Sequence, residues 1–157
     1  MDWISALPFI SRLWNWYRSL LGLNRIHDVA VFKKLDAIAN ESRVEDILHH
    51  RIFTSQLRPQ DEQTLVDLRD AISRIENHYL DSTVQLRADE LGWEIGRLLS
   101  LIGKTFWSVP QGWKKFRPDP IDPQVYDAEW RELIELIDST WRAYEAYRKA
   151  VKERLKV

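Results

Sequence analysis

The sequence predicts an all-α protein, an antiparallel helical bundle of four or more helices with an N-terminal amphipathic helix and one Pro-rich loop before a long C-terminal helix. Apolar residues recur at helical spacing along most of the 157 residues. Glycine is scarce, with 5 in the chain, which leaves few sites for tight turns. Four of the 6 prolines fall within residues 108–123, and no regular helix tolerates that density.

A chain of this length can bury a sizeable core, so we expect one domain. We divide it into an N-terminal amphipathic helix, residues 1–24, and a helical bundle domain, residues 25–157. The net charge of −1 argues against a general attraction to nucleic acid, and the absence of cysteine excludes disulfides, thiol catalysis and thiolate-bound metals. Asp2 and Arg12 interrupt any secretory leader, so a cytoplasmic protein is expected.

The first helix is expected to begin at Pro8 and to stop at Gly22, where glycine is a common helix terminator. Its polar face carries Arg12 and Arg18 and no acid. The apolar residues fall within an arc of about 160°, and with one residue ahead of the helix they are the predicted partner- or membrane-binding set: Trp3, Phe9, Leu13, Trp14, Trp16, Tyr17 and Leu20. Two arginines in hydrocarbon disfavour a membrane span, which leaves packing against protein or an interfacial position on a membrane surface.

Two shorter helices are expected next. One covers roughly Asp28–Asn40 and carries Phe32, Leu35, Ile38 and Ala39 on one side. The other begins at Ser42, which forms a capping-box pattern with Glu45, and carries Val44, Ile47, Leu48 and Ile52.

The next two apolar patterns differ in direction. Leu65, Leu68, Ile72, Ile75 and Tyr79 form one pattern after Pro59, and Val84, Leu91, Ile95, Leu98 and Ile102 form the other. On one continuous helix the two would point about 150° apart. We therefore favour a break near Asp81-Ser82, with Ser82 and Gln85 as a capping box, over a single helix buried on both faces. Leu86 and Trp93 lie off the second pattern and predict a further packing partner for that helix.

The last helix has the clearest pattern. Its apolar residues fall within an arc of about 100°: Tyr126, Trp130, Leu133, Ile134, Ile137, Trp141, Tyr144, Val151 and Leu155. Acidic residues come early and basic residues late, as the helix dipole favours. A single helix of roughly eight turns is predicted.

No catalytic, cofactor or metal site is predicted. His49 and His50 each follow a carboxylate by four residues, but exposed pairs on a helix surface explain that spacing. The chain has no G-x-S-x-G, P-loop or dinucleotide-binding pattern.

The Pro-rich loop holds the best basic and aromatic cluster: Trp113, Lys114, Lys115, Phe116 and Arg117. Such residues can stack bases and neutralise phosphates, or the aromatic side chains can tuck the loop onto the bundle. A protein-docking loop is the preferred interpretation, and nucleic-acid binding is not expected.

The sequence thus predicts a non-enzymatic helical interaction protein, an adaptor or subunit of a larger assembly. Its partner would be another protein or a second copy of the chain, because the predicted helices offer more apolar faces than one small bundle needs. One alternative keeps this fold and makes the N-terminal helix a peripheral membrane anchor, which would place the protein at the membrane surface. A second alternative is an enzyme or nucleic-acid-binding effector with a scattered site.

Overall fold

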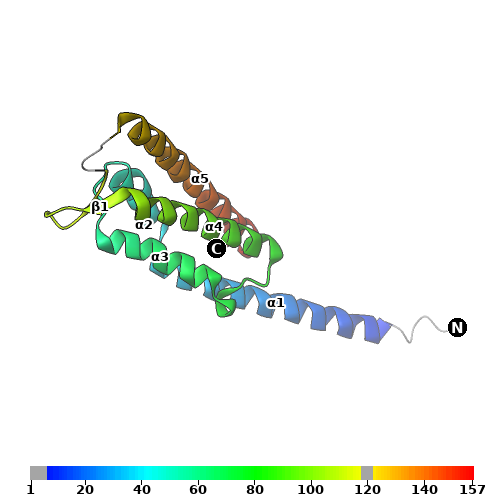
Figure 1. Cartoon of the computed structure of the whole chain (residues 1–157). Helices are drawn as coiled ribbons and strands as arrows, with labels where there is room; N and C mark the ends of the chain where they lie inside the picture. The colour runs from blue at the N-terminus through cyan, green and yellow to red at the C-terminus, as the bar shows by residue number, and fades with distance from the viewer. Residues whose placement is uncertain (1–6, 118–121) are drawn as a thin grey trace.

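The computed structural model describes residues 7–117 and 122–157, with side chains from residue 22 onward, and it is mostly helical (Figure 1). The all-α class is confirmed, with two short strands in addition. The elements in chain order are α1 (Leu7–Ile38), α2 (Glu41–Glu45), the π-helical turn η2 (Asp46–Ile52), α3 (Pro59–Ser73), the 3-10 turn η3 (Ile75–Asn77), α4 (Ser82–Thr105), β1 (Phe106–Ser108), β2 (Lys114–Phe116) and α5 (Pro123–Leu155).

The first helix does not stop at Gly22, and this prediction is wrong. Helix α1 continues through Gly22 to Ile38 and so absorbs the separate helix expected from Asp28. Glycine ends a helix efficiently when it adopts a left-handed conformation, but Gly112 is the only glycine of the described residues with positive φ. A glycine in a helix interior is tolerated at a cost of about 1 kcal/mol relative to alanine.

Helix α4 lies at the centre of the core, because it makes the most extensive contacts with α5 and the next most extensive with α3. The core positions predicted for α4 are buried, as are five of those predicted for α5: Val84, Leu91, Ile95, Leu98 and Ile102, with Leu133, Ile137, Tyr144, Val151 and Leu155. Within the described parts of the chain, no helix is both long and apolar enough to cross a membrane.

The predicted break before α4 is confirmed, but it is longer than expected. Helix α3 ends at Ser73, so Ile75 and Tyr79 do not continue its apolar face. Ile75 lies in η3 with 85% of its surface exposed, which contradicts the prediction that it packs in the core. Tyr79 is buried, but it enters the core from the linker between η3 and α4.

The helix caps also differ from the predicted ones. Asn40, not Ser42, caps α2 by accepting a hydrogen bond from the Arg43 amide. Asp81, not Ser82, caps α4, and Gln85 accepts from the backbone amide of Tyr79 instead of closing a capping box. In both cases the cap moved one or two residues upstream to an Asn or Asp, which are at least as good helix caps as serine.

Within the predicted Pro-rich segment, residues 108–117 are non-helical as expected, but they contain an unpredicted strand. Strand β2 pairs with β1 in antiparallel register, with Phe106 opposite Phe116 and Trp107 opposite Lys115. Gly112, in the connecting turn, has φ of 87°, a conformation that favours glycine. Strands of three residues are too short to show an alternating pattern, so no strand period could be detected in these residues.

Candidate functional site

The base of the projecting helix α1 is held by a buried carboxylate. Asp28 is only 1% exposed and accepts hydrogen bonds from the backbone amides of Leu80 and Asp81 at 2.7 and 2.9 Å. Arg25 adds a bond from its Nε to the carbonyl of Leu155 at 2.9 Å. The linker before α4 and the C-terminal end of α5 therefore hold α1 to the packed body from about Arg25 onward.

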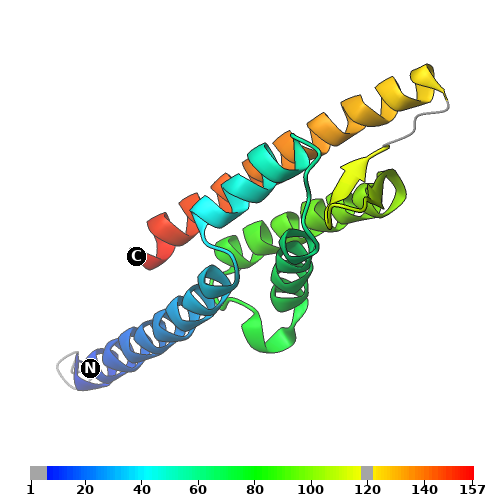
Figure 2. The same cartoon turned by 90° about the vertical axis from the view of Figure 1, so that its left-hand side faces the viewer.

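On the N-terminal side of Arg25, α1 extends past the packed body (Figures 1 and 2). Leu23 and Ile26 are 60% and 68% exposed where the helix leaves it. Next to Ile26, Val29 and Ala30 line one side of a shallow groove of about 530 Å³ that reaches Val157. An apolar surface thus begins on the described part of α1.

The predicted binding residues of the first helix lie mostly beyond what the structure describes. Trp3 lies outside the described residues. The others belong to α1, but their side chains are not among those described: Phe9, Leu13, Trp14, Trp16, Tyr17 and Leu20. Their assignment as contact residues stays a prediction.

The Pro-rich loop separates its aromatic residues from its cations. Phe116 is buried and packs edge-to-face on Phe106, Tyr126 and Trp130, with ring centroids 5.1 to 5.7 Å apart. Lys114 binds Glu62, with 2.6 Å between Nζ and Oε2. These residues attach the hairpin to the body.

Arg117 is likewise occupied, because its guanidinium binds both carboxylate oxygens of Glu129 at 2.7 Å. The same bond lowers the pKa of Glu129 below its ordinary value, since it stabilises the charged form. Two of the three loop cations are therefore neutralised by the chain itself. Little charge remains there for phosphate.

One exposed aromatic side chain of the hairpin was not among the predicted contact residues. Trp107, 58% exposed, lies opposite the exposed Lys115 in the strand register. Trp113 is half-buried and its Nε1 has no hydrogen-bond partner among the described residues. The structure thus brings Lys115 together with Trp107, a pairing that only the register of the unpredicted strands reveals.

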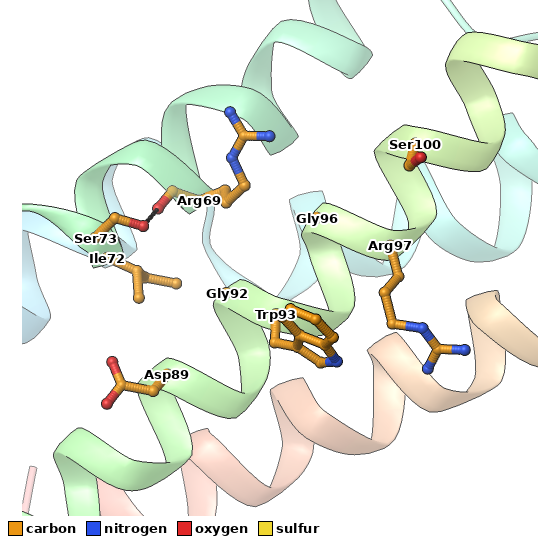
Figure 3. A pocket seen from close by; sticks show the side chains of 9 residues that line it. All are labelled: Arg69, Ile72, Ser73, Asp89, Gly92, Trp93, Gly96, Arg97 and Ser100. Carbon is orange, nitrogen blue, oxygen red and sulfur yellow. Dashed lines mark hydrogen bonds between the residues drawn. The ribbon is translucent and has the colours of Figure 1, made fainter.

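Helix α4 has an exposed apolar face that no part of the described chain covers. Trp93 is 70% exposed and Leu86 is 55% exposed. Gly92 and Gly96 lie beside Trp93 on the side toward α3, where they border a shallow groove of about 460 Å³ (Figure 3). The further packing partner predicted for these off-pattern residues is therefore not another element of the described chain.

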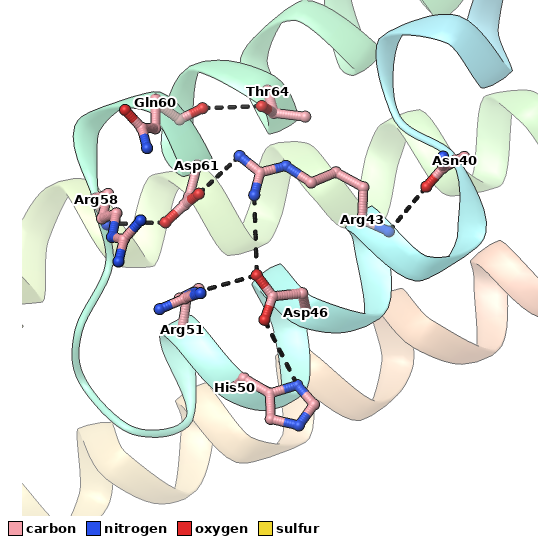
Figure 4. A network of polar contacts seen from close by, with 9 residues as sticks. All are labelled: Asn40, Arg43, Asp46, His50, Arg51, Arg58, Gln60, Asp61 and Thr64. Atoms are coloured by element: carbon pink, nitrogen blue, oxygen red, sulfur yellow. Dashed lines mark hydrogen bonds and ion pairs between the residues drawn. The ribbon is translucent and has the colours of Figure 1, made fainter.

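A polar network fastens α2 and η2 to the start of α3 (Figure 4). Asp61, 1% exposed, accepts from Arg43 Nη2 at 2.7 Å and from the Arg58 amide at 3.1 Å. Asp46 contacts Arg51 at 3.1 Å and His50 at 3.9 Å. The carboxylates are satisfied by cations and amides, and the described residues hold no group of three or more potential ligands arranged for a metal ion.

Three buried tyrosines pack in the core. Tyr79 and Tyr147 share a hydrogen bond of 2.5 Å between their hydroxyls. Burial raises the pKa of both tyrosines, and of Tyr144, further above neutrality. A general base needs a pKa near the working pH, so this shift runs opposite to catalytic tuning.

His49 stacks edge-on against Trp141, with ring centroids 5.2 Å apart, on the surface between η2 and α5. It is exposed and lies beside no described pocket with converging acids or bases. Its contact is an aromatic one.

Comparisons of the chain with protein-family models, with curated proteins and with solved structures give no match.

Proposed function

We propose that this chain is a non-enzymatic helical interaction protein, an adaptor or subunit of a larger protein assembly. Its body would be an antiparallel bundle that presents α1 to another protein. The observation that carries the proposal is the course of α1, which leaves the body near Arg25 and extends past it (Figure 2). The exposed Leu23 and Ile26 mark the start of the surface that would be covered.

Helix stability supports a covered α1. Most helical stability in proteins comes from packing an apolar face against other elements, and isolated helices of a few turns are marginal in water. The projecting part contains Trp14, Trp16 and Tyr17, which are weaker helix formers than alanine or leucine. A partner that packs on its apolar arc would supply the missing contacts.

The test compares two pairs of glutamate substitutions on opposite faces of the first helix. Leu13→Glu with Leu20→Glu places charge on the apolar arc, and Asn15→Glu with Ser19→Glu places the same charge on the polar face. Each tagged full-length protein is used to capture partners from its native host, and the captured proteins are quantified by mass spectrometry.

We expect a partner that wild type and the polar-face variant capture equally and the apolar-face variant does not. Equal capture by all three proteins would contradict docking through this face. Circular dichroism and thermal melting of each variant establish that the body is folded.

A membrane surface is the second candidate, and the charge distribution favours it. Residues 7–27 contain Arg12, Arg18 and Arg25 and no acidic residue. Anionic lipid attracts such a helix, with each cation near the surface contributing about 1 kcal/mol. Sedimentation with vesicles rich in phosphatidylserine distinguishes the two functions. Binding that is lost in Arg12→Glu with Arg18→Glu supports the membrane, and wild-type protein that stays in the supernatant excludes it.

A further inference from the structure

The exposed face of α4 is built around one tryptophan at the middle of the helix. Trp93 is 11 residues after Ser82 and 12 before Thr105, the two ends of α4. Leu86, seven residues earlier, lies on nearly the same side, because seven residues make almost two turns. Large aromatic residues exposed on a monomer are typical of the centres of protein interfaces.

We propose that this face binds a second copy of the chain, with the two α4 helices packed antiparallel about a twofold axis at Trp93. In that arrangement each residue before Trp93 meets the residue equally far after it in the partner. Because Trp93 lies at the midpoint, the two helices would overlap along their whole length of about 36 Å.

Charge complementarity favours a second copy over an unrelated partner. Asp89 and Arg97 are both exposed and stand four residues before and four residues after Trp93. The twofold axis therefore brings Asp89 of each copy opposite Arg97 of the other, and the pair occurs twice. A parallel arrangement would instead place like charges opposite each other, which is unfavourable.

The two charged residues are free to make this contact. Asp89 accepts a hydrogen bond from Gln85 but has no ion pair within the described residues. Arg97 contacts Glu94 at 3.1 Å, and 49% of its side chain remains exposed. Its guanidinium has five donors, so it can bridge Glu94 and the partner's carboxylate.

The shape of the face is also self-complementary. Gly92 is already covered by Ile72 of α3. Gly96 leaves the groove beside Trp93 open, since an added Cβ there would contact only Arg69 Cδ, at 3.8 Å (Figure 3). The indole of the second copy can lie over Gly96. The same axis sets Leu86 opposite the small Ser100, so a large side chain meets a small one at each end.

The first measurement is the mass of the full chain by sedimentation equilibrium over a concentration series reaching the submillimolar range. We expect a monomer–dimer equilibrium. Trp93→Ala removes the central contact and is expected to raise the dissociation constant at least about tenfold. A wild-type chain that stays monomeric throughout the series, or a dimer that Trp93→Ala leaves unchanged, overturns the proposal.

Charge reversal tests the arrangement itself. Asp89→Arg gives a chain with two cations at these positions, and Arg97→Asp gives one with two acids. Each variant alone is expected to dimerise at least about tenfold more weakly, since like charges then face each other twice. An equimolar mixture should form a heterodimer with wild-type affinity, detectable by native mass spectrometry, and the double variant should regain self-association. Failure of both the mixture and the double variant to recover dimerisation overturns the antiparallel pairing.

The matched control is another exposed aspartate and arginine, on a different helix. Asp138 and Arg142 stand four residues apart on α5 and are 54% and 75% exposed in their side chains. Asp138→Arg and Arg142→Asp are expected to leave dimerisation unchanged, and an equal loss would mean that net charge acts instead of the α4 face. The site is separate from α1, so the glutamate substitutions at Leu13 and Leu20 should not affect the dimer whether or not a partner binds there.

Discussion

The two long helices of this protein, α1 and α5, have nearly the same length and different surroundings. Helix α1 has 32 residues and α5 has 33. The contact between α4 and α5 is the most extensive between any two elements of the described chain. Helix α1 makes only modest contacts with α3 and α5, near its C-terminal end (Figures 1 and 2). Helix α5 forms one side of the core, whereas α1 projects from the body and is anchored only toward its C-terminal end.

An amphipathic pattern therefore predicts that one face of a helix will be covered, but it does not identify the element or partner that covers it. Both helices have an apolar arc in the sequence. The arc of α5 finds α4 within the same chain, and Leu133, Tyr144 and Val151 become buried. Where α1 leaves the body it meets no such element among the described residues, since Leu23 and Ile26 stay exposed.

The largest expected effect comes from the same substitution made in each helix. Leu133→Ala removes a side chain that is 0% exposed and should lower the free energy of unfolding by about 2–5 kcal/mol, because it leaves a cavity. Leu23→Ala removes a side chain that is 60% exposed and should change it by less than about 0.5 kcal/mol. Urea denaturation followed by circular dichroism measures both. Similar losses for the two variants would show that α1 is already part of the core at Leu23, ahead of its anchored base.

An intermediate effect is expected at the anchor of α1. Asp28→Ala leaves the backbone amides of Leu80 and Asp81 without their acceptor and should cost about 2–3 kcal/mol. Asp28→Asn keeps one oxygen and should cost less. Denaturation gives the free energies, and hydrogen exchange should speed up most at these two amides.

The control for Asp28 is a carboxylate on the surface. Asp67 is exposed and bonds only to Gln63 among the described residues, so Asp67→Ala should stay within about 0.5 kcal/mol. Equal losses at the two positions would show that Asp28 does not anchor α1.

The helices could be predicted where one face is buried for several turns. The predicted apolar positions of α4 and five of those of α5 repeat at helical spacing and are buried as expected, because packing against each other selects that spacing. The ends of elements were less predictable. Glycine often ends a helix and serine often caps one, but α1 continues through Gly22 and Asn40 caps α2 in place of Ser42.

The surfaces could be predicted only in part. Trp93 was recognisable as a residue off the core pattern, and its exposure agrees with that. The anchoring role of Asp28 and the pairing of Trp107 with Lys115 could not be predicted, because each depends on segments far apart in the chain or on an unpredicted register. The loop cations looked in the sequence like a free basic cluster, but Lys114 and Arg117 form ion pairs with carboxylates on α3 and α5.

The smallest effect on global stability is expected at Gly22, where α1 projects from the packed body. An added Cβ at Gly22 meets no atom within 4 Å, so Gly22→Ala should strengthen α1 by about 1 kcal/mol without a clash. Because the segment before Gly22 projects from the body, that gain should appear as slower amide exchange within α1, with the unfolding midpoint nearly unchanged. Gly22→Pro should interrupt the helix and lower its helical signal, since proline lacks the amide hydrogen and clashes with the preceding turn. If Gly22→Pro unfolded the whole protein instead, the first turns of α1 would have to be part of the core, and α1 would resemble α5 after all.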